Sequence, residues 1–198
     1  MLLRSSESLA MKKQKEQSLS LGLAKMGGFL LLAALGLLPT RVAAQSVIGW
    51  GDNSLGQVDV PPSATNAISV AAGYAHSLAL LSNGTVVAWG DNRLLQTQVP
   101  LSATNTTAIA AGYYFSLALQ ADGSVVAWGD NFYHQTNVPP SVTNAVAIAA
   151  GRYHGLALRV DGTVIAWGEN AHGQTNVPVA ATNIVAIAAG AEHCIGIR

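Results

Sequence analysis

The sequence is poor in the residues that most often carry crosslinks or chemistry. Of its 198 residues one is cysteine, 10% are charged and 6% are aromatic. A lone thiol, Cys194, cannot form a disulfide within one chain, so the stability of the fold must come from packing. We therefore expect a protein held together by apolar contacts and backbone hydrogen bonds.

Lysine is absent after the first 44 residues. The segment from residue 45 to 198 has four arginines against eight acidic residues, a formal charge of −4, although the whole sequence sums to zero. A mildly acidic segment without lysine lacks the positive surface that binds DNA or RNA. It also lacks a basic patch for anionic lipid. These absences predict neither a nucleic-acid partner nor a membrane partner once the N-terminal segment is removed.

The hydrophobic run near the N-terminus is short. It spans Gly27–Leu38, about twelve residues, whereas a membrane helix needs roughly 20. Lysines precede it, and the small residues Val42–Ala44 follow it. This order predicts a secretory signal peptide over residues 1–44, cleaved ahead of Gln45, with an uncleaved anchor as the alternative. We therefore expect a secreted or periplasmic protein.

The sequence does contain a strict internal repeat. Four tryptophans, each followed by glycine, an acidic residue and asparagine, are spaced by 39 residues each time: Trp50, Trp89, Trp128 and Trp167. A fixed period in this range is typical of solenoids and propellers. Residues 45–198 are therefore predicted to form one domain of repeats.

Each repeat predicts three short strands. The first covers residues 68–72, 107–111, 146–150 and 185–189, the second covers 77–81, 116–120, 155–159 and 194–198, and the third carries the tryptophan. Branched residues alternate with alanine rather than with charged residues, as expected for strands that have sheets on both faces. Asn83-Gly84 and its equivalents predict two-residue type I′ hairpins, with positive φ at both central residues. A Val-Pro pair later in each repeat predicts a loop that crosses to the next sheet.

These elements predict an all-β fold, a β-propeller or propeller arc of about four short three-stranded blades. Residues 46–50 have the sequence of a third strand, and we expect them to complete the last blade. That pairing would close a ring and hide the sheet edges. A closed or nearly closed arrangement of four blades is favoured, and an open arc that forms a homodimer is the alternative.

The combined motif resembles a known repeat. Gly73–Leu80, Asn83-Gly84, Val86–Asn92, Gln96-Thr97 and Val99-Pro100 together resemble the regulator of chromosome condensation repeat, and are closer to short secreted repeats like those of beta-lactamase inhibitor protein II. The resemblance implies a β-propeller that binds through loops on one face and has no catalytic activity. Those families build seven blades, and the nuclear members act as exchange factors on a small GTPase and touch chromatin. A lysine-free, acidic chain fits neither task.

Some repeat positions argue against a metal or catalytic centre. The position of His76 is occupied by Phe115, His154 and His193 in the other repeats, and a position that accepts phenylalanine is not a metal or acid–base site. We expect these histidines to be buried rings with one hydrogen bond each. The Asp-Asn pairs supply one acid per repeat, fewer than the clustered acids of a calcium site. No metal and no cofactor are predicted, and the asparagines and glutamines of each repeat are expected to hold loops in place.

The positions that vary between repeats lie after the first strand and after the Asp-Asn pair. Loops of a propeller project side by side, so the residues at these positions would share one surface. Tyrosine and arginine are enriched at interface anchors, although ordinary loop residues in a drifting repeat are the alternative. The predicted partner-binding surface comprises Tyr74, Arg93, Tyr113, Tyr114, Phe132, Tyr133, His134, Arg152, Tyr153, His172 and Glu192.

The sequence thus predicts a secreted, non-catalytic module that binds a protein partner. One alternative is a hydrolase or lyase that acts through loop residues such as Asp130, His134 and His172, but their spacing predicts no pairing of base and nucleophile. A second alternative is a structural repeat module of a cell-surface assembly.

Overall fold

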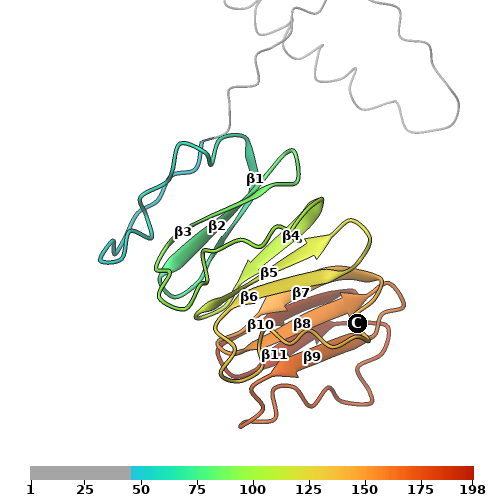
Figure 1. Ribbon diagram of the computed structural model, residues 1–198. Coiled ribbons are helices and arrows are strands. Elements are labelled where there is room, and N and C mark those ends of the chain that lie inside the picture. Colours follow the sequence, from blue (N-terminus) through green and yellow to red (C-terminus); the bar gives the residue numbers. More distant parts are fainter. Residues whose placement is uncertain (1–45) are drawn as a thin grey trace, which may run out of the picture. The chain divides into compact units, whose positions relative to one another are not determined.

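The computed structural model describes residues 46–198, so the predicted signal peptide lies outside the described residues. Figure 1 shows four successive antiparallel sheets in this part of the chain. None of the described residues forms a helix long and apolar enough to span a membrane. The strands are β1 (Ala67–Ala72), β2 (His76–Leu81) and β3 (Val86–Gly90); β4 (Thr106–Ala111), β5 (Phe115–Gln120) and β6 (Val125–Gly129); β7 (Ala145–Ala150), β8 (His154–Arg159) and β9 (Val164–Gly168); and β10 (Ala186–Ala189) and β11 (Cys194–Ile197).

Each sheet corresponds to one repeat, and the pairing register is the same in each. The order is first, second, third strand, all antiparallel, in the three complete sheets. In the three complete sheets, the tryptophan lies opposite the small residue that follows the histidine position: Ser77 with Trp89, Ser116 with Trp128 and Gly155 with Trp167. The predicted all-β fold of 39-residue repeats is confirmed.

The hairpin turns differ from the prediction. Gly84 has a φ of 80°, whereas Asn83 does not have a positive φ, so the type I′ prediction was wrong. The amide of Gly84 donates to the carbonyl of Leu81 (2.9 Å), and Thr85 N–H donates to Asn83 Oδ1 (3.0 Å). The connection is therefore a β-turn followed by one glycine in the left-handed region. The asparagine side chain holds the turn in this form, and Gly123 and Gly162 repeat it.

The two faces of each sheet differ, and this difference forms the core. Leu78 and Leu80 of β2 project from one face and pack with Ala118 and Trp128 of the next sheet. The second interface repeats the scheme, with Leu117 and Leu119 against Ala157 and Trp167. Alanine on one face lets the sheets approach closely, and leucine on the other fills the space between them. The alternation of branched residues and alanine thus sets the stacking.

The tryptophans fix the crossing loops. The indole Nε1 of Trp128 donates to the carbonyl oxygen of Gln96 (2.9 Å), which lies in the loop that enters the same sheet. Trp89 and Trp167 make the same bond to the equivalent glutamines. The side chain of Gln96 is also used, since its Oε1 accepts from Leu94 N–H (2.9 Å). Each loop is therefore bound to the sheet that follows it.

The buried histidines form a second link between sheets. His76 Nε2 lies 3.0 Å from Ser116 Oγ, and His154 Nε2 lies 3.2 Å from Cys194 Sγ. Because Ser116 Oγ donates to the Gln96 carbonyl (2.9 Å), we infer that His76 Nε2 carries the proton. Burial lowers the pKa of His76 to about 4 and also lowers the pKa of His154. Two of the three histidine positions are thus buried as expected, whereas His193 is exposed.

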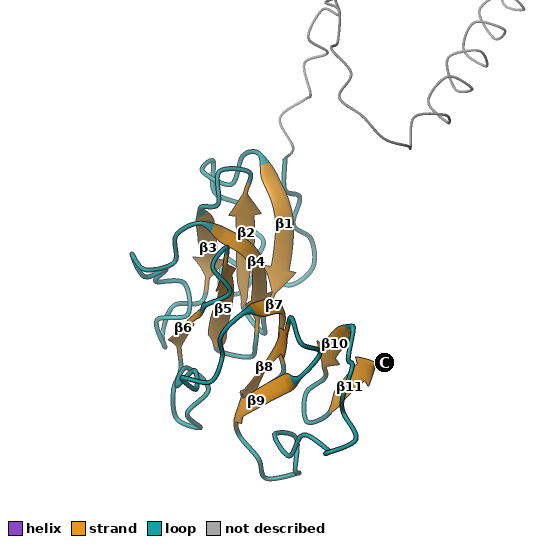
Figure 2. Cartoon of the chain, turned by 90° about the vertical axis from the view of Figure 1, so that its right-hand side faces the viewer, coloured by secondary structure: helices purple, strands orange, loops and turns teal. Residues whose placement is uncertain are grey.

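The predicted closure of the ring is absent from the single chain. Residues 47–50 form no strand, and Ser46 makes an isolated bridge to Thr65 of the first repeat. The fourth sheet has two strands among the described residues. Figure 2 shows β10 and β11 beside the third sheet and away from the first sheet. The packed interfaces between successive sheets hold the two ends apart.

Candidate protein-binding surface

The turns between the first and second strands of the sheets lie against one another. A Cβ atom on Gly73 would lie 2.6 Å from the carbonyl oxygen of Gly112, and one on Gly112 would lie 2.8 Å from that of Gly151. Tyr113 N–H donates to Arg152 O (3.1 Å), and Arg152 N–H donates to Ala191 O (3.2 Å). Only glycine permits this close approach of backbones. The residues after each glycine are therefore brought into one row, beside a surface hollow of about 450 Å³.

Six aromatic rings form a continuous cluster on this side of the sheets. We call Tyr74, Tyr113, Tyr114, Phe132, Tyr133 and Tyr153 the aromatic cluster. Tyr74 and Tyr113 are stacked with their ring centroids 4.0 Å apart, and Tyr113 contacts Tyr114 and Tyr153 at 4.6 and 5.7 Å. Tyr133 continues the cluster, with centroids 4.9 Å from those of Tyr153 and Phe132. Phe132 is 77% exposed, so the cluster presents apolar surface to solvent.

Charged groups border the aromatic cluster at one end. The Arg152 guanidinium lies 5.0 Å from the ring centroids of both Tyr113 and Tyr153, within the range of a cation–π contact. It also lies 3.6 Å from Glu192, whose carboxylate is 3.7 Å from His172 Nδ1. The nearby Tyr153 hydroxyl is the largest cause that raises the pKa of Arg152. The predicted residues Arg152, His172 and Glu192 are thus joined to the aromatic cluster.

Arg93 has a structural partner that sequence reasoning missed. Its Nε and Nη2 donate to the two carboxylate oxygens of Asp91 at 2.8 and 3.0 Å. Asp91 is buried, and these hydrogen bonds lower the pKa of its carboxyl group. The hydrogen bonds to Asp91 are the largest cause that raises the pKa of Arg93, and Tyr114 and Tyr74 contribute less. The available signal was an arginine two residues after the aspartate, which no other repeat has.

The structure does not assemble the catalytic set considered for an enzyme. Asp130 accepts from Gln135 Nε2 (2.8 Å) and Phe132 N–H, and His134 Nδ1 lies 3.2 Å from the Asn137 amide. His172 instead faces Glu192. His134 is therefore fixed to its own turn, where its φ is 62°. In residues 46–198, no three His, Cys, Asp or Glu side chains form a group that could hold a metal ion.

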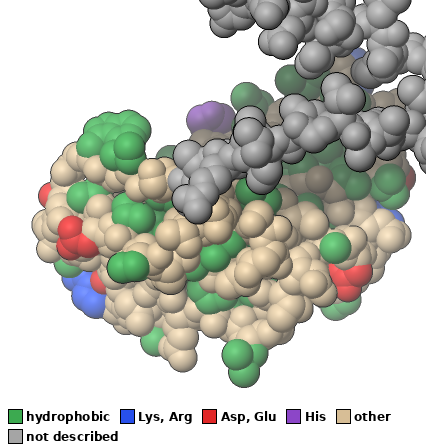
Figure 3. Space-filling view, turned by 90° about the horizontal axis from the view of Figure 1, so that it is seen from above, with side chains coloured by type: hydrophobic (Ala, Val, Ile, Leu, Met, Phe, Trp, Pro, Cys, Tyr) green, Lys and Arg blue, Asp and Glu red, His purple; other side chains and the backbone are tan. Residues whose placement is uncertain are grey.

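The surface of this part of the chain carries few charges. The space-filling view of Figure 3 shows apolar and uncharged atoms over most of the visible face, with isolated acidic and basic side chains. This distribution follows from a sequence with 10% charged residues. The aromatic cluster is therefore set in a surface with weak electrostatic character.

Repeated antiparallel sheets that pack face to face, with their inner turns in one row, are the blades of a β-propeller. The chain is thus a propeller-type repeat protein. The model of the regulator of chromosome condensation (RCC1) repeat matches residues 67–96, 107–135 and 145–174. The chain therefore contains repeats of the RCC1 type, as its motifs predicted.

Solved structures show the same fold. Yeast RCC1 (Prp20) bound to Kap60 aligns with a TM-score of 0.55 and 21% identity, over 66% of this chain and 41% of that chain. Prp20p from Saccharomyces cerevisiae, described with its binding to Gsp1p and histones, aligns with a TM-score of 0.55 and 23% identity, over 66% and 43%. The ectodomain of the receptor kinase CR4 from Physcomitrella patens aligns with a TM-score of 0.52 and 25% identity, over 63% of this chain and 34% of that chain. No curated protein matches the sequence.

The chain spans less than half the length of these solved structures. At this identity the likeness shows the fold. RCC1-repeat propellers are usually binding or regulatory modules, and the yeast proteins bind protein partners.

Proposed function

We propose that this protein is a secreted, non-catalytic module that binds a protein partner through the aromatic cluster and the charged groups beside it. The observation that carries the proposal is the continuous contact of six aromatic rings from successive repeats, with Phe132 and Tyr74 largely exposed. Tyrosine and arginine are the residue types that most often anchor protein interfaces. A rigid scaffold that presents aromatic side chains from loops is also the arrangement of antibody combining sites.

The hydrogen bonds that hold the loop of Phe132 and Tyr133 favour binding over catalysis. The loop that carries Phe132 is held by Asp130 and Gln135, which accept hydrogen bonds from Phe132 N–H and Tyr133 N–H. The rings are therefore ordered before a partner arrives, which lowers the entropy cost of association. The polar groups of the loops are used in these bonds and not as a base paired with a nucleophile. No metal or cofactor is needed for this role.

The charged border favours a protein over a glycan as the partner. Arg152 and Glu192 lie 3.6 Å apart, so one end of the surface offers both a cation and an anion beside apolar rings. Such mixed rims are typical of protein interfaces. A formal charge of −4 for four arginines against eight acidic residues in residues 45–198 opposes nucleic acid as the partner.

Secretion or periplasmic export is supported by the lysines, apolar run and small residues of the first 44 positions. N-terminal sequencing of the exported protein tests this part of the proposal. We expect the mature chain to begin at Gln45, and retention of residues 1–44 on a membrane would contradict it.

The binding surface is tested by capture of partners from the extracellular fraction of the source cells. The variant Tyr74→Ala/Phe132→Ala removes the most exposed rings of the aromatic cluster without opening the core. A matched control, Leu101→Ala/Val179→Ala, removes two exposed apolar side chains from the crossing loops. We expect the first variant to bind about tenfold or more weakly, since anchors cost more than 1 kcal/mol each when truncated. Equal loss in both variants, or in neither, would contradict the proposal.

A further inference from the structure

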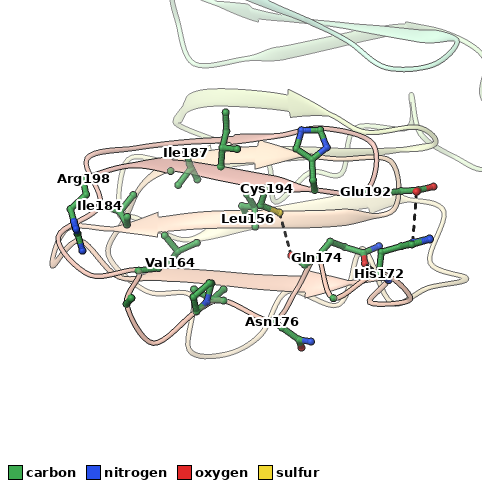
Figure 4. Close-up of a pocket in the computed structure, with 18 residues that line it drawn as sticks. Leu156, Val164, His172, Gln174, Asn176, Ile184, Ile187, Glu192, Cys194 and Arg198 are labelled. Atoms are coloured by element: carbon green, nitrogen blue, oxygen red, sulfur yellow. Dashed lines mark hydrogen bonds and ion pairs between the residues drawn. The ribbon is translucent and has the colours of Figure 1, made fainter.

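A cavity lies in the fourth sheet at the place where the other sheets have their third strand. Its volume is about 560 Å³, and it is lined by Leu156 and Val164 of the third sheet, Gln174 of the crossing loop, and Cys194 and Ile195 of β11. Figure 4 shows Leu156, Val164, Gln174 and Cys194 around the cavity, with the hydrogen bond from Cys194 to the Gln174 carbonyl drawn as a dashed line. The lining is mainly apolar, so the cavity suits an apolar strand.

In the third sheet, the equivalent position is filled by the third strand and its tryptophan. There Trp167 of β9 lies against Gly155, and its Nε1 donates to the carbonyl of Gln135 (2.9 Å). One period further along the chain, the equivalents of Gly155 and Gln135 are Cys194 and Gln174. Both line the cavity, so the cavity has the partners that a tryptophan strand uses in the other sheets.

Residues 46–50 have the sequence of that strand but form no strand within their own chain. Trp50 is 84% exposed, whereas Trp128 at the equivalent position is 6% exposed. Ile48 is also largely exposed. Ser46 bridges Thr65, and the backbone of Gly49 lies against Val58, so the segment stays beside the first repeat. Figure 2 shows β11 away from the sheet of this repeat.

The outer faces of the first and fourth sheets are complementary in the same way. Ile195 is 65% exposed, whereas Leu156 at the equivalent position is 1% exposed beneath the next sheet. On the first sheet, Val70 is exposed where its equivalents pack on a neighbour. His193 has no serine opposite it, and Ser77, whose Oγ donates to Gln57 O (2.7 Å), has no histidine opposite it among the described residues. The two ends supply each other's missing partners.

We propose that two copies of the chain associate end to end, with residues 46–50 of each copy forming the third strand of the other copy's fourth sheet. The register that the complete sheets share sets Trp50 opposite Cys194 and Val47 opposite Ile197. The Trp50 indole then donates to the Gln174 carbonyl, and His193 donates to Ser77. Two copies make eight three-stranded sheets, within the usual range of four to eight blades, and leave no sheet without its third strand.

A disulfide placed in this register tests which chain supplies the strand. Val47→Cys and Ile197→Cys are combined with Cys194→Ser, which copies Ser77 and Ser116 and removes the native thiol. The full chain is expressed with its own N-terminal segment, and the purified product is oxidised and run on a non-reducing gel, with each single cysteine variant as a control. We expect a covalent species of two chains. A one-chain species whose thiols are lost would show closure of a chain on itself, and free thiols would show no pairing; either result overturns the proposal.

Solution mass provides the second test. Wild type should have the mass of two chains, and Trp50→Asp or Ile195→Asp should weaken association about 100-fold or more, because each removes a buried apolar anchor. Neither residue is buried in the single chain, so these variants should fold, and Val179→Asp is the matched exposed control. A mixture of the two variants should regain a two-chain species through one unaltered interface. A single-chain mass for wild type, masses that grow beyond two chains with concentration, or full association of Trp50→Asp would overturn the proposal.

Discussion

The pair of His76 and Ser116 can be exchanged for the pair that the next interface uses. There Phe115 occupies the histidine position, and Gly155 occupies the serine position one sheet further on. Both interfaces are buried, so the two solutions fill equivalent space. The double variant His76→Phe/Ser116→Gly should therefore be tolerated better than either single variant.

The expected energies follow from the hydrogen bonds. Ser116→Gly alone leaves the buried His76 N–H without an acceptor, which costs about 1–3 kcal/mol. Glycine within a strand adds about 0.5–1 kcal/mol. His76→Phe alone removes the same hydrogen bond and crowds Ser116, whose hydroxyl still donates to Gln96 O. The unpaired N–H is absent from the double variant, so the two changes should couple by about 1–2 kcal/mol.

The same variant should change the response to acid. Burial lowers the pKa of His76 from 6.5 to about 4. Between these values the unfolded chain binds a proton that the folded chain does not, so the free energy of unfolding falls as the pH falls. At about 1.4 kcal/mol per pH unit, the loss from His76 amounts to about 3 kcal/mol by pH 4. The variant lacks this contribution, while the smaller effect of His154 is present in both proteins.

Urea unfolding followed by tryptophan fluorescence at pH 7 and at several values down to pH 4 measures both effects. At pH 7 we expect the double variant to lose less stability than the sum of the losses in the two single variants. In acid we expect the double variant to lose less stability than wild type does. The matched control is Ser77→Gly in the Trp50→Asp background, in which the proposed association is weakened and Ser77 has no histidine opposite it within its own chain. Strict additivity of the single variants, together with an unchanged acid response, would refute the role given to this pair.

Three further predictions concern single residues. Trp128→Phe should cost about 2 kcal/mol in urea unfolding, because it removes the bond to Gln96 O and part of a buried ring; Trp50→Phe should leave the stability of the single chain unchanged. Gly123→Ala should lower stability by about 1 kcal/mol or more, since its φ is 80° and a Cβ would lie 2.8 Å from Asn144 Cα; a stabilised variant would contradict this. Arg93→Ala should cost about 1 kcal/mol in thermal unfolding, because Asp91 loses its bidentate partner but keeps the backbone N–H of residue 93 as a donor; Arg93→Lys should restore only part of the loss.

The sequence predicted the repeat, the strands and their order because periodic signals repeat at every sheet. The first strand of the second repeat was expected at residues 107–111 and is observed at Thr106–Ala111. The turn type was missed because Asn83 accepts a hydrogen bond from Thr85 N–H, a contact that the Asn-Gly pair alone does not reveal. The prediction that one chain closes a ring was wrong. The repeat length determines the strands of each sheet, but the angle between successive sheets depends on how residues such as Leu78 and Trp128 pack.

The candidate surface was predicted in part for a similar reason. Tyr74 and Tyr113 occupy equivalent positions of successive repeats, which indicated that they would be neighbours, and their rings are stacked in the structure. The pairing of Arg93 with Asp91 and the confinement of His134 to its turn depend on side-chain geometry within single loops. Their partnership with any ligand stays a prediction.

The hydrogen bond from Trp89, Trp128 and Trp167 to a loop carbonyl separates the residues that anchor each loop from the residues that recognise a partner. Trp128 binds the backbone of Gln96, and not a side chain of the residues that precede it in the same loop. Substitutions at Arg93, Phe132 and their equivalents can therefore alter what the protein recognises while the anchor beneath them is unchanged. A randomised library at these positions should yield folded proteins with new specificities.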